Sequence, residues 1–417
     1  MKRVAIISGA RTAFVKAGTS FKDKTALDLA SQTILETIKR AKIESSKIDE
    51  IVYGQVLLNP RFPNFARELV LRNNIPKSIA AHFVSNNCIT GLVAMEFVRS
   101  SIIAGRISIG LAGGVESMSK PTLTLGEAGE DFFVNLNYAK TFGQKLKLLT
   151  KFRPKFLLPN PPSPKEPSTG LTMGQHCELM AKEFKIAREV QDEIAYLSHK
   201  NAFNAQENNF LAEEIVDISG VNKDNVIRGD TSQEKLAKLK PVFDRSEQGT
   251  LTAGNSSPLT DGASCVCLAS EEKAKEMGLE ILGYIEAVEF SGLNPSDGLL
   301  MAPSIAVSNL FIKNNLSVSD IDRFEIHEAF AAQVACNLQV WASGWSKIPE
   351  YKTIGEIPQE KINVNGSSIA IGHPFAATGG RLILSLVNEL KRNNLRKGVV
   401  SICAAGAMAG AVLVTRD

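Results

Sequence analysis

The chain has 417 residues, of which 44% are hydrophobic and 22% are charged. This composition is typical of a globular protein, and the length favours two or three packed units over a single core. The formal net charge of +3 is small for this size. It gives no electrostatic reason to expect nucleic-acid binding, although a local basic patch for an anionic substrate stays possible.

The number and spacing of the cysteines indicate the cellular compartment of the protein. The chain has six cysteines, and their spacing contains neither a C-x-x-C pair nor a disulfide framework. The N-terminal segment enters a strand-like apolar run at once, without the features of a secretory signal. Free thiols without such a signal predict a cytoplasmic protein. No apolar stretch approaches the roughly twenty residues that span a bilayer.

The first 120 residues alternate short apolar strands with amphipathic helices. We predict strands over 4–8, 48–56, 80–84 and 108–112, the last ended by Gly113 and Gly114, and a helix over 26–42. Apolar residues at helical spacing predict a second helix that begins near Cys88. This alternation favours an α/β layered domain with a largely parallel sheet.

The pattern changes between about residues 120 and 241. Prolines cluster at positions 159, 161, 162, 164 and 167, and a polar helix is predicted over 188–208. Segment 144–159, QKLKLLTKFRPKFLLP, holds five cations, no acid and many Leu and Phe residues. A basic amphipathic helix of this kind can lie on a membrane surface or bind a partner helix. Alternatively, it packs its apolar side chains on the core and solvates its lysines.

The last third repeats the first in outline. Strand patterning returns at 264–268 and 281–288, and IDRFEI at 321–326 is a counterpart of IDEIV at 48–52. The run HFVSNNCITGL resembles INVNGSSIAIGHP, and 399–403 matches 108–112. We therefore predict two related α/β halves whose turns face one another where strand ends meet helix starts.

Three segments carry reactive groups at such turns. Cys88 is expected at a helix N-terminus, where the dipole and free N–H groups would lower the pKa of the thiol. His373, between Gly and Pro, can take a proton from a nearby thiol and later hydrogen-bond a carbonyl oxygen. Cys403 precedes tiny side chains that let backbone N–H groups face a ligand oxygen. The structural alternative for Cys88 is a small buried hydrophobic residue. The alternative for His373 is a turn cap, and that for Cys403 is close packing of two layers.

His327 and the pair Cys265 and Cys267 are further candidates for a chemical role. His327 ends a strand and starts a helix in the run HEAF, again at the ligand-facing edge of a sheet. On its own, this residue is better explained as a hydrogen-bonded structural histidine. Cys265 and Cys267 alternate on one strand without a histidine partner, which argues against a metal site.

Taken together, these segments resemble the thiolase family along essentially the whole chain. NNCITGL is similar to the family's nucleophile motif, and GGVESMS follows at 113–119. TAGNSSPLTDGA, HEAFAAQ, GHPFAATGG and CAAGAMAGA then occur in the family's order. The resemblance implies an α/β fold of five layers, αβαβα, built from two related halves with an inserted, mostly helical loop domain. The halves would comprise 1–120, completed by about 245–275, and 276–417, and the loop domain 121–244.

The resemblance also implies thiolytic cleavage of a 3-ketoacyl-CoA, with no separate cofactor because CoA is itself a substrate. Cys88 would attack the keto carbon after giving its proton to His373. Cys403 would protonate the departing acetyl-CoA enolate and later deprotonate CoA, and His327 would assist His373 and backbone N–H groups in stabilising the oxyanion. The positions that line the family's CoA tunnel are Met173, Arg228, Phe243, Ala253 and Ser257.

HEAF and GHPF together resemble the long-chain branch of the family, which includes the β-subunits of fatty-acid β-oxidation trifunctional complexes. The expected substrate is therefore a medium- or long-chain 3-ketoacyl-CoA. Expected partners are a second copy of the chain, a β-oxidation α-subunit and a membrane surface at 144–159. Three positions depart from the family pattern because alanine replaces glycine, which predicts an altered rate or acyl preference; they are Ala376, Ala407 and Ala409.

Three alternative functions follow from the same residues. One is an acetoacetyl-CoA thiolase that works in the condensing direction. Another is a decarboxylating ketosynthase on acyl-carrier protein, against which Cys403 speaks, because those sites resemble Cys-His-His. The third is a lipid-binding protein that keeps the fold without catalysis.

Overall fold

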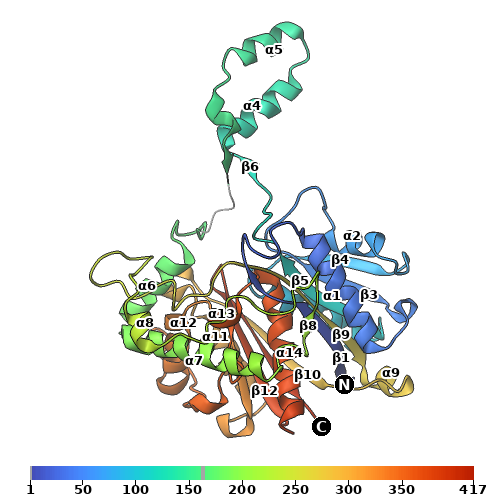
Figure 1. Cartoon of the computed structure of the whole chain (residues 1–417), viewed down its shortest axis with the longest axis vertical. Helices are drawn as coiled ribbons and strands as arrows, with labels where there is room; N and C mark the ends of the chain where they lie inside the picture. The colour runs from blue at the N-terminus through green and yellow to red at the C-terminus, as the bar shows by residue number, and fades with distance from the viewer. Residues whose placement is uncertain (1, 161–164) are drawn as a thin grey trace.

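The computed structural model describes residues 2–160 and 165–417. Its main sheet has 11 strands in the order β11-β12-β13-β10-β1-β9-β5-β3-β4, with β2 paired to β9 and β8 to β1 (Figure 1). The strands of the first half are β1 (Val4–Thr12), β2 (Val15–Lys16), β3 (Glu50–Gly54), β4 (Ala80–Val84), β5 (Ile109–Glu116), β8 (Ile215–Val216) and β9 (Thr260–Ser270). Those of the second half are β10 (Gly283–Gly292), β11 (Arg323–Ile326), β12 (Lys397–Ala404) and β13 (Met408–Thr415).

The two halves repeat one strand pattern. In the first, β4, β3 and β5 are parallel, and β9 and β1 follow antiparallel. In the second, β11 and β12 are parallel, and β13 and β10 follow antiparallel. Antiparallel pairing of β1 with β10 joins the halves. The counterpart of β4 is reduced to a single bridge between Phe324 and Ile362. The predicted internal repeat is therefore confirmed.

Helices form three layers around these strands. The inner layer is α3 (Thr90–Ile103) and α14 (Thr378–Arg392), whose apolar residues share one core with strands of both halves. The outer layer of the first half contains α1 (Ala26–Ala41), α2 (Phe65–Arg72) and α9 (Glu271–Glu276). The second half has α10 (Pro295–Gly298), α11 (Ala302–Lys313), α12 (Ala331–Ser343) and α13 (Ser368–Ile371). The layering agrees with the expected five-layer α/β arrangement.

Local chemistry explains the ends of α1, which matches the predicted helix 26–42 closely. The Thr25 side chain accepts from the Asp28 backbone N–H, and the Asp28 carboxylate accepts from that of Thr25. This capping box satisfies donors that the first helical turn leaves free. The helix ends at Lys42, which adopts a left-handed conformation with φ of 55°. Such a residue commonly terminates a helix.

One predicted boundary is wrong. Strand β5 does not end at Gly113 and Gly114 but continues to Glu116. The two glycines serve close packing instead: a Cβ on Gly113 would stand 2.3 Å from the Ser264 carbonyl oxygen, and one on Gly114 would stand 2.1 Å from that of Ala376. The missing side chain of Gly113 allows β5 to approach β9, and that of Gly114 allows it to approach the segment that follows His373.

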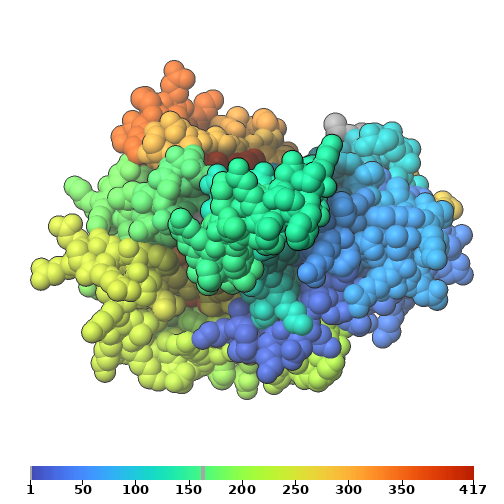
Figure 2. Space-filling view, turned by 90° about the horizontal axis from the view of Figure 1, so that it is seen from above, coloured from blue at the N-terminus to red at the C-terminus, as the bar shows by residue number. Residues whose placement is uncertain are grey.

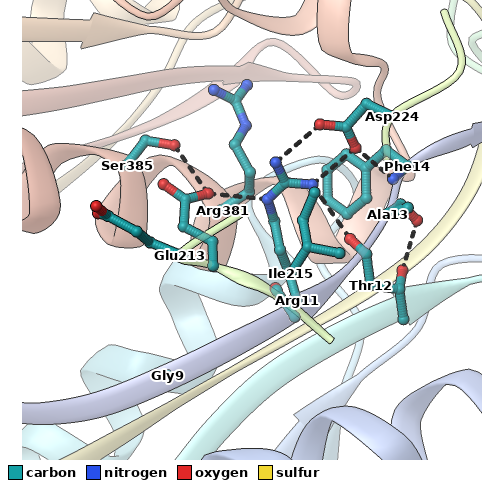
Figure 3. A network of polar contacts seen from close by, with 12 residues as sticks. Gly9, Arg11, Thr12, Ala13, Phe14, Glu213, Ile215, Asp224, Arg381 and Ser385 are labelled. Carbon is teal, nitrogen blue, oxygen red and sulfur yellow. Dashed lines mark hydrogen bonds and ion pairs between the residues drawn. The ribbon is translucent and has the colours of Figure 1, made fainter. Parts of the chain in front are cut away.

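A buried ion network fixes the first strand to the inserted region (Figure 3). The Arg11 guanidinium donates to both carboxylate oxygens of Asp224 at 2.8 and 2.9 Å and to Glu214 at 2.8 Å. Ser385 of α14 donates to the same Glu214 carboxylate. Because each of these charges is buried, removing one partner would leave the others uncompensated. The network therefore holds β1, residues 214–224 and α14 in one arrangement.

The region between β5 and β9 is mostly helical. It contains β6 (Thr124–Leu125), α4 (Glu127–Tyr138), α5 (Phe142–Leu149), the 3-10 helix η2 (Pro154–Leu157), β7 (Pro159–Asn160), α6 (Met173–Glu183), α7 (Arg188–Glu207) and α8 (Gln233–Ala237). Of the predicted proline cluster, positions 161, 162 and 164 lie outside the described residues. Whether 121–244 is a domain in its own right stays a prediction.

Residues 124–160 form a hairpin that stands clear of the body in Figure 1 and lies in front of it in the view from above in Figure 2. The predicted amphipathic helix over 144–159 is wrong as one element, because α5 ends at Leu149 and Pro154 starts a separate 3-10 turn. Three aromatic rings pack together in the hairpin. The centroid of the Phe132 ring lies 5.5 Å from that of Phe152 and 5.4 Å from that of Phe156. Phe152 and Phe156 of this segment therefore pack on Phe132 within the hairpin, whereas most of its leucines stay exposed.

Candidate active site

Cys88 lies in the turn between β4 and α3. The preceding Asn87 has φ of 47°, a left-handed conformation that Asn tolerates better than most residues. The Thr90 hydroxyl accepts from the Asn86 N–H at 2.8 Å and donates to the Asn87 carbonyl at 2.7 Å. The turn is therefore held on both sides of the cysteine, whose side chain is half-buried. Helix α3 begins at Thr90, two residues beyond Cys88.

His373 meets Cys88 from the other half. Gly372, with φ of 110°, leads into it, and the His373 backbone N–H donates to Thr260 at 2.8 Å. The ring is held by a 2.6 Å hydrogen bond between Nδ1 and the Thr378 hydroxyl. Its Nε2 lies 3.2 Å from the Cys88 sulfur. If Nδ1 donates to Thr378, Nε2 is free to accept the thiol proton.

Cys403 is buried at the end of β12, with the loop 404–407 after it. Asn87 donates to the Ala405 carbonyl at 3.1 Å, and the Gly406 N–H donates to the Glu166 carboxylate at 2.9 Å. Burial raises the pKa of Cys403 well above the usual range, and the nearby Cys88 raises it further. The hydrogen bond from Asn87 to Ala405 brings the turn that carries Cys88 against the loop that follows Cys403.

His327 follows β11 and stacks near His373, with the ring centroids 4.0 Å apart. Its Nδ1 lies 2.7 Å from the Ser368 hydroxyl. Burial lowers the pKa of His327 well below its usual range, and the neighbouring His373 lowers it further. The structure thus brings together the four residues for which the sequence predicted catalytic roles.

The ionisation of Cys88 and His373 differs from what the sequence predicted. Burial raises the pKa of Cys88 to about 12, although backbone N–H groups of Ala405 and Cys88 itself oppose the shift. Burial also lowers the pKa of His373 to about 3. The expected lowering of the thiol pKa by a helix N-terminus is wrong, because desolvation outweighs the backbone donors. At neutral pH the pair rests as thiol and neutral imidazole.

The residues expected to line a CoA tunnel are spread over the inserted region and the segment that precedes β9. Met173 and Phe243 pack with the apolar cluster that includes Cys403. The Ser257 N–H donates to the Ala329 carbonyl at 2.9 Å, close to His327 in sequence. Ala253 and Arg228 are exposed, and the Arg228 N–H donates to His199 of α7 at 3.3 Å. The apolar pair thereby shares a hydrophobic cluster with a predicted catalytic residue.

The three alanines that depart from the family pattern have different surroundings. The Ala376 N–H donates to Glu116 at 3.3 Å, and the missing side chain of Gly114 makes room for its methyl. Ala407 adopts φ of 53°, a conformation that glycine would adopt without strain. Ala409 is a buried residue of β13 opposite Cys403. The Ala376 and Ala409 methyls thus occupy packed positions, and only Ala407 bears backbone strain.

Sequence reasoning missed three polar residues around the site. Glu116 is buried, accepts from the N–H groups of Val56, Leu57 and Ala376, and has its pKa raised to about 7 by burial. Ser368 and Arg381 stand behind His327. Glu116 belongs to the GGVES run and could have been suspected there. No sequence signal pairs Ser368 with Arg381.

Comparison with known families decides the relationship. The description "Thiolase, N-terminal domain" matches residues 4–272, and "Thiolase, C-terminal domain" matches residues 279–416. The chain belongs to the thiolase family. A 3-ketoacyl-CoA thiolase of Pseudoalteromonas translucida is 42% identical to this thiolase over 99% of the chain and 96% of the relative. One of Serratia proteamaculans is 40% identical with the same coverage.

A solved structure is also similar to this thiolase. The Bacillus anthracis acetyl-CoA acetyltransferase superposes with a TM-score of 0.84 at 30% identity, covering 100% of this chain and 99% of that one. In the described part of the thiolase, no group of three or more His, Cys, Asp or Glu side chains is arranged to hold a metal ion. The helices described here include none with the length and hydropathy needed to cross a bilayer.

Proposed function

We propose that this thiolase cleaves medium- or long-chain 3-ketoacyl-CoA with CoA, giving acetyl-CoA and an acyl-CoA shortened by two carbons. The observation that carries the proposal is the 3.2 Å contact between the Cys88 sulfur and His373 Nε2, beside the loop that follows Cys403 and accepts a hydrogen bond from Asn87. Full-length similarity to proteins named 3-ketoacyl-CoA thiolase supports the same reaction class.

The first half-reaction forms an acyl-enzyme. As the Cys88 sulfur attacks the keto carbon, its proton moves to His373, whose low pKa keeps the imidazole available as a base. The resulting alkoxide is stabilised by N–H donors near the sulfur, including that of Ala405. The bond between the α- and β-carbons then breaks, the Cys403 thiol protonates the acetyl-CoA enolate, and the acyl group stays on Cys88.

The second half-reaction releases the product. The Cys403 thiolate takes the proton of an incoming CoA thiol, and the CoA sulfur attacks the acyl carbon. When this second tetrahedral intermediate collapses, the Cys88 sulfur leaves and recovers its proton from His373. Both residues return to their starting protonation states. No redox partner or metal is needed for this balance.

Turnover with a ladder of 3-ketoacyl-CoA esters tests the proposal on the purified chain. We expect kcat/KM for a ten- to sixteen-carbon ester to exceed that for acetoacetyl-CoA by about tenfold or more, since each buried CH₂ adds about 0.8 kcal/mol of binding. Cys88→Ser supplies the blank. A preference for four carbons would favour the condensing alternative. Absence of thiolysis at every length would favour the lipid-binding alternative.

The partners follow as part of the proposal. Strand β4 ends the sheet, and among the described residues no strand pairs with its outer side, which is a natural surface for a second copy of the chain. The HEAF and GHPF runs support a β-oxidation α-subunit as a further partner, in the cytoplasm, where six free cysteines would stay reduced.

The hairpin at 124–160 supports peripheral contact with an anionic membrane. Phe142 is 81% exposed, and Leu146 and Leu149 beside it are about half exposed. Lys145 and Lys147 lie on the same helix. Apolar side chains beside lysines are the combination that binds the interface of anionic lipid bilayers. We therefore place the membrane contact on α5 and the turn that precedes it.

Sedimentation with lipid vesicles checks this contact. The double variant Phe142→Ser/Leu146→Ser is expected to lose at least about fivefold in binding to vesicles rich in phosphatidylglycerol, because apolar insertion and charge act together. Leu259→Ser is the matched control, since Leu259 is a similarly exposed leucine of the main body. Equal binding by the double variant and the control would contradict the proposal, as would equal binding to neutral phosphatidylcholine vesicles.

A further inference from the structure

The position of the ring proton on His327 decides whether this residue can donate a hydrogen bond to the oxyanion. The residue type alone does not fix that position, because either nitrogen of a neutral imidazole can carry the proton. The side chain is fully buried behind His373, and its backbone N–H donates to the Ser401 carbonyl at 2.8 Å. Of the two ring nitrogens, Nδ1 contacts the Ser368 hydroxyl, whereas Nε2 has no hydrogen-bond partner within the described residues. A neutral imidazole carries one proton, so it donates from only one of these atoms.

Arg381 determines which way the Ser368 hydroxyl points. Its Nη2 lies 3.0 Å from the Ser368 oxygen and 3.2 Å from that of Ser367. A guanidinium only donates, so both oxygens accept. Ser367 has a separate acceptor for its own proton, the Ile326 carbonyl at 2.9 Å. For Ser368, the acceptor that the described structure offers is His327 Nδ1.

The opposite tautomer fits the surroundings less well. If Nδ1 donated to Ser368, the Ser368 hydroxyl proton would have no acceptor among the described residues, and buried donors without partners are costly. The guanidinium also disfavours a protonated ring, because its charge adds to the lowering of the pKa of both His327 and His373. Glu325, 3.7 Å from Arg381, is the ion-pair partner that keeps this charge buried.

We propose that Arg381 and Ser368 are positioning residues that hold His327 as the neutral tautomer with its proton on Nε2. Nε2–H is then a fixed donor beside the His373 ring, at the place where the alkoxide of the proposed reaction develops negative charge. The role deepens the proposed thiolysis and rests on it. Neither Arg381 nor Ser368 needs to touch the substrate for this effect.

Ring nitrogen NMR of the protein labelled with ¹⁵N-histidine reads the tautomer directly. Signals of His327 are assigned by their loss in His327→Asn. We expect the wild type and Ser367→Ala to show a protonated Nε2 and an unprotonated Nδ1, and Ser368→Ala to show a mixture of tautomers. Ser367→Ala is the matched control, because Ser367 is a buried neighbour that also contacts Arg381 but not His327. A protonated Nδ1 in the wild type would overturn the proposal.

Kinetics provide the second readout. Ser368→Ala is expected to lower kcat by about tenfold with KM changed by less than about twofold, because one oxyanion donor is weakened. In the His327→Asn background, whose amide donates without any tautomer, Ser368→Ala should cost less than about twofold. An equal loss in both backgrounds would mean a structural role and would overturn the proposal. A wild type without thiolysis would refute the proposed function, while the spectrum would still decide the tautomer.

Discussion

Cys403→Ser should lower the kcat of thiolysis by about 1,000-fold, within the range usual for a lost acid–base group. Serine keeps the size of the side chain but is a far weaker acid than a thiol, so it protonates the enolate poorly. It also cannot accept the proton of CoA as readily. The measurement is steady-state turnover of a 3-ketoacyl-CoA ester, followed through loss of substrate absorbance.

Two controls make the Cys403 result specific. Cys336→Ser removes another buried thiol of the same apolar cluster and should leave kcat within about threefold, since mutation of packing residues mainly affects stability. In Cys403→Ser itself, Cys88 should still be alkylated by iodoacetamide, which shows that the nucleophile turn is intact. Full thiolysis by Cys403→Ser would refute the acid–base role.

The second large effect is the pH dependence of Cys88 alkylation. Because its pKa is raised to about 12, the thiolate fraction should rise about tenfold for each pH unit across neutral pH. The rate constant for iodoacetamide is therefore expected to increase about 1,000-fold between pH 6 and pH 9 without a plateau. Mass spectrometry of the peptide that contains residue 88 measures it.

The shape of this pH dependence distinguishes two ionisation states of Cys88 and His373. A preformed thiolate–imidazolium pair would react at a constant rate above a midpoint below pH 7. A buried thiol beside a neutral imidazole gains reactivity only as protons are removed from bulk solution. A plateau at neutral pH in the free enzyme would show that backbone donors outweigh desolvation, contrary to the pKa shifts of Cys88 and His373.

Much of the fold was predictable because local pattern and tertiary structure agree. Strand β4 has the predicted bounds, and the parallel repeat of β3–β5 in β11–β12 follows from two similar sequence runs. The convergence of Cys88 and His373 was also predictable, since turns at the carboxyl ends of parallel strands meet at one edge.

What sequence could not supply depends on burial and on long-range contacts. Desolvation of Cys88 is a property of the assembled halves, and the local sequence around a helix N-terminus carries no signal of it. The end of β5 differs from the prediction because Gly113 and Gly114 pack against Ser264 and Ala376, which are distant in sequence. The protruding hairpin also escaped prediction, because its aromatic rings pack on one another.

The internal repeat has a consequence for how the chemistry is divided. The turn after β4 carries Cys88, and the corresponding turn after the Phe324–Ile362 bridge carries Ser368. One loop pattern, present twice, would thus supply the attacking sulfur of Cys88 in one half. In the other half it would supply the Ser368 hydroxyl, which holds the His327 imidazole in place. Neither copy holds the full set alone, so a fragment ending near residue 275 should be inert until its complement docks against it.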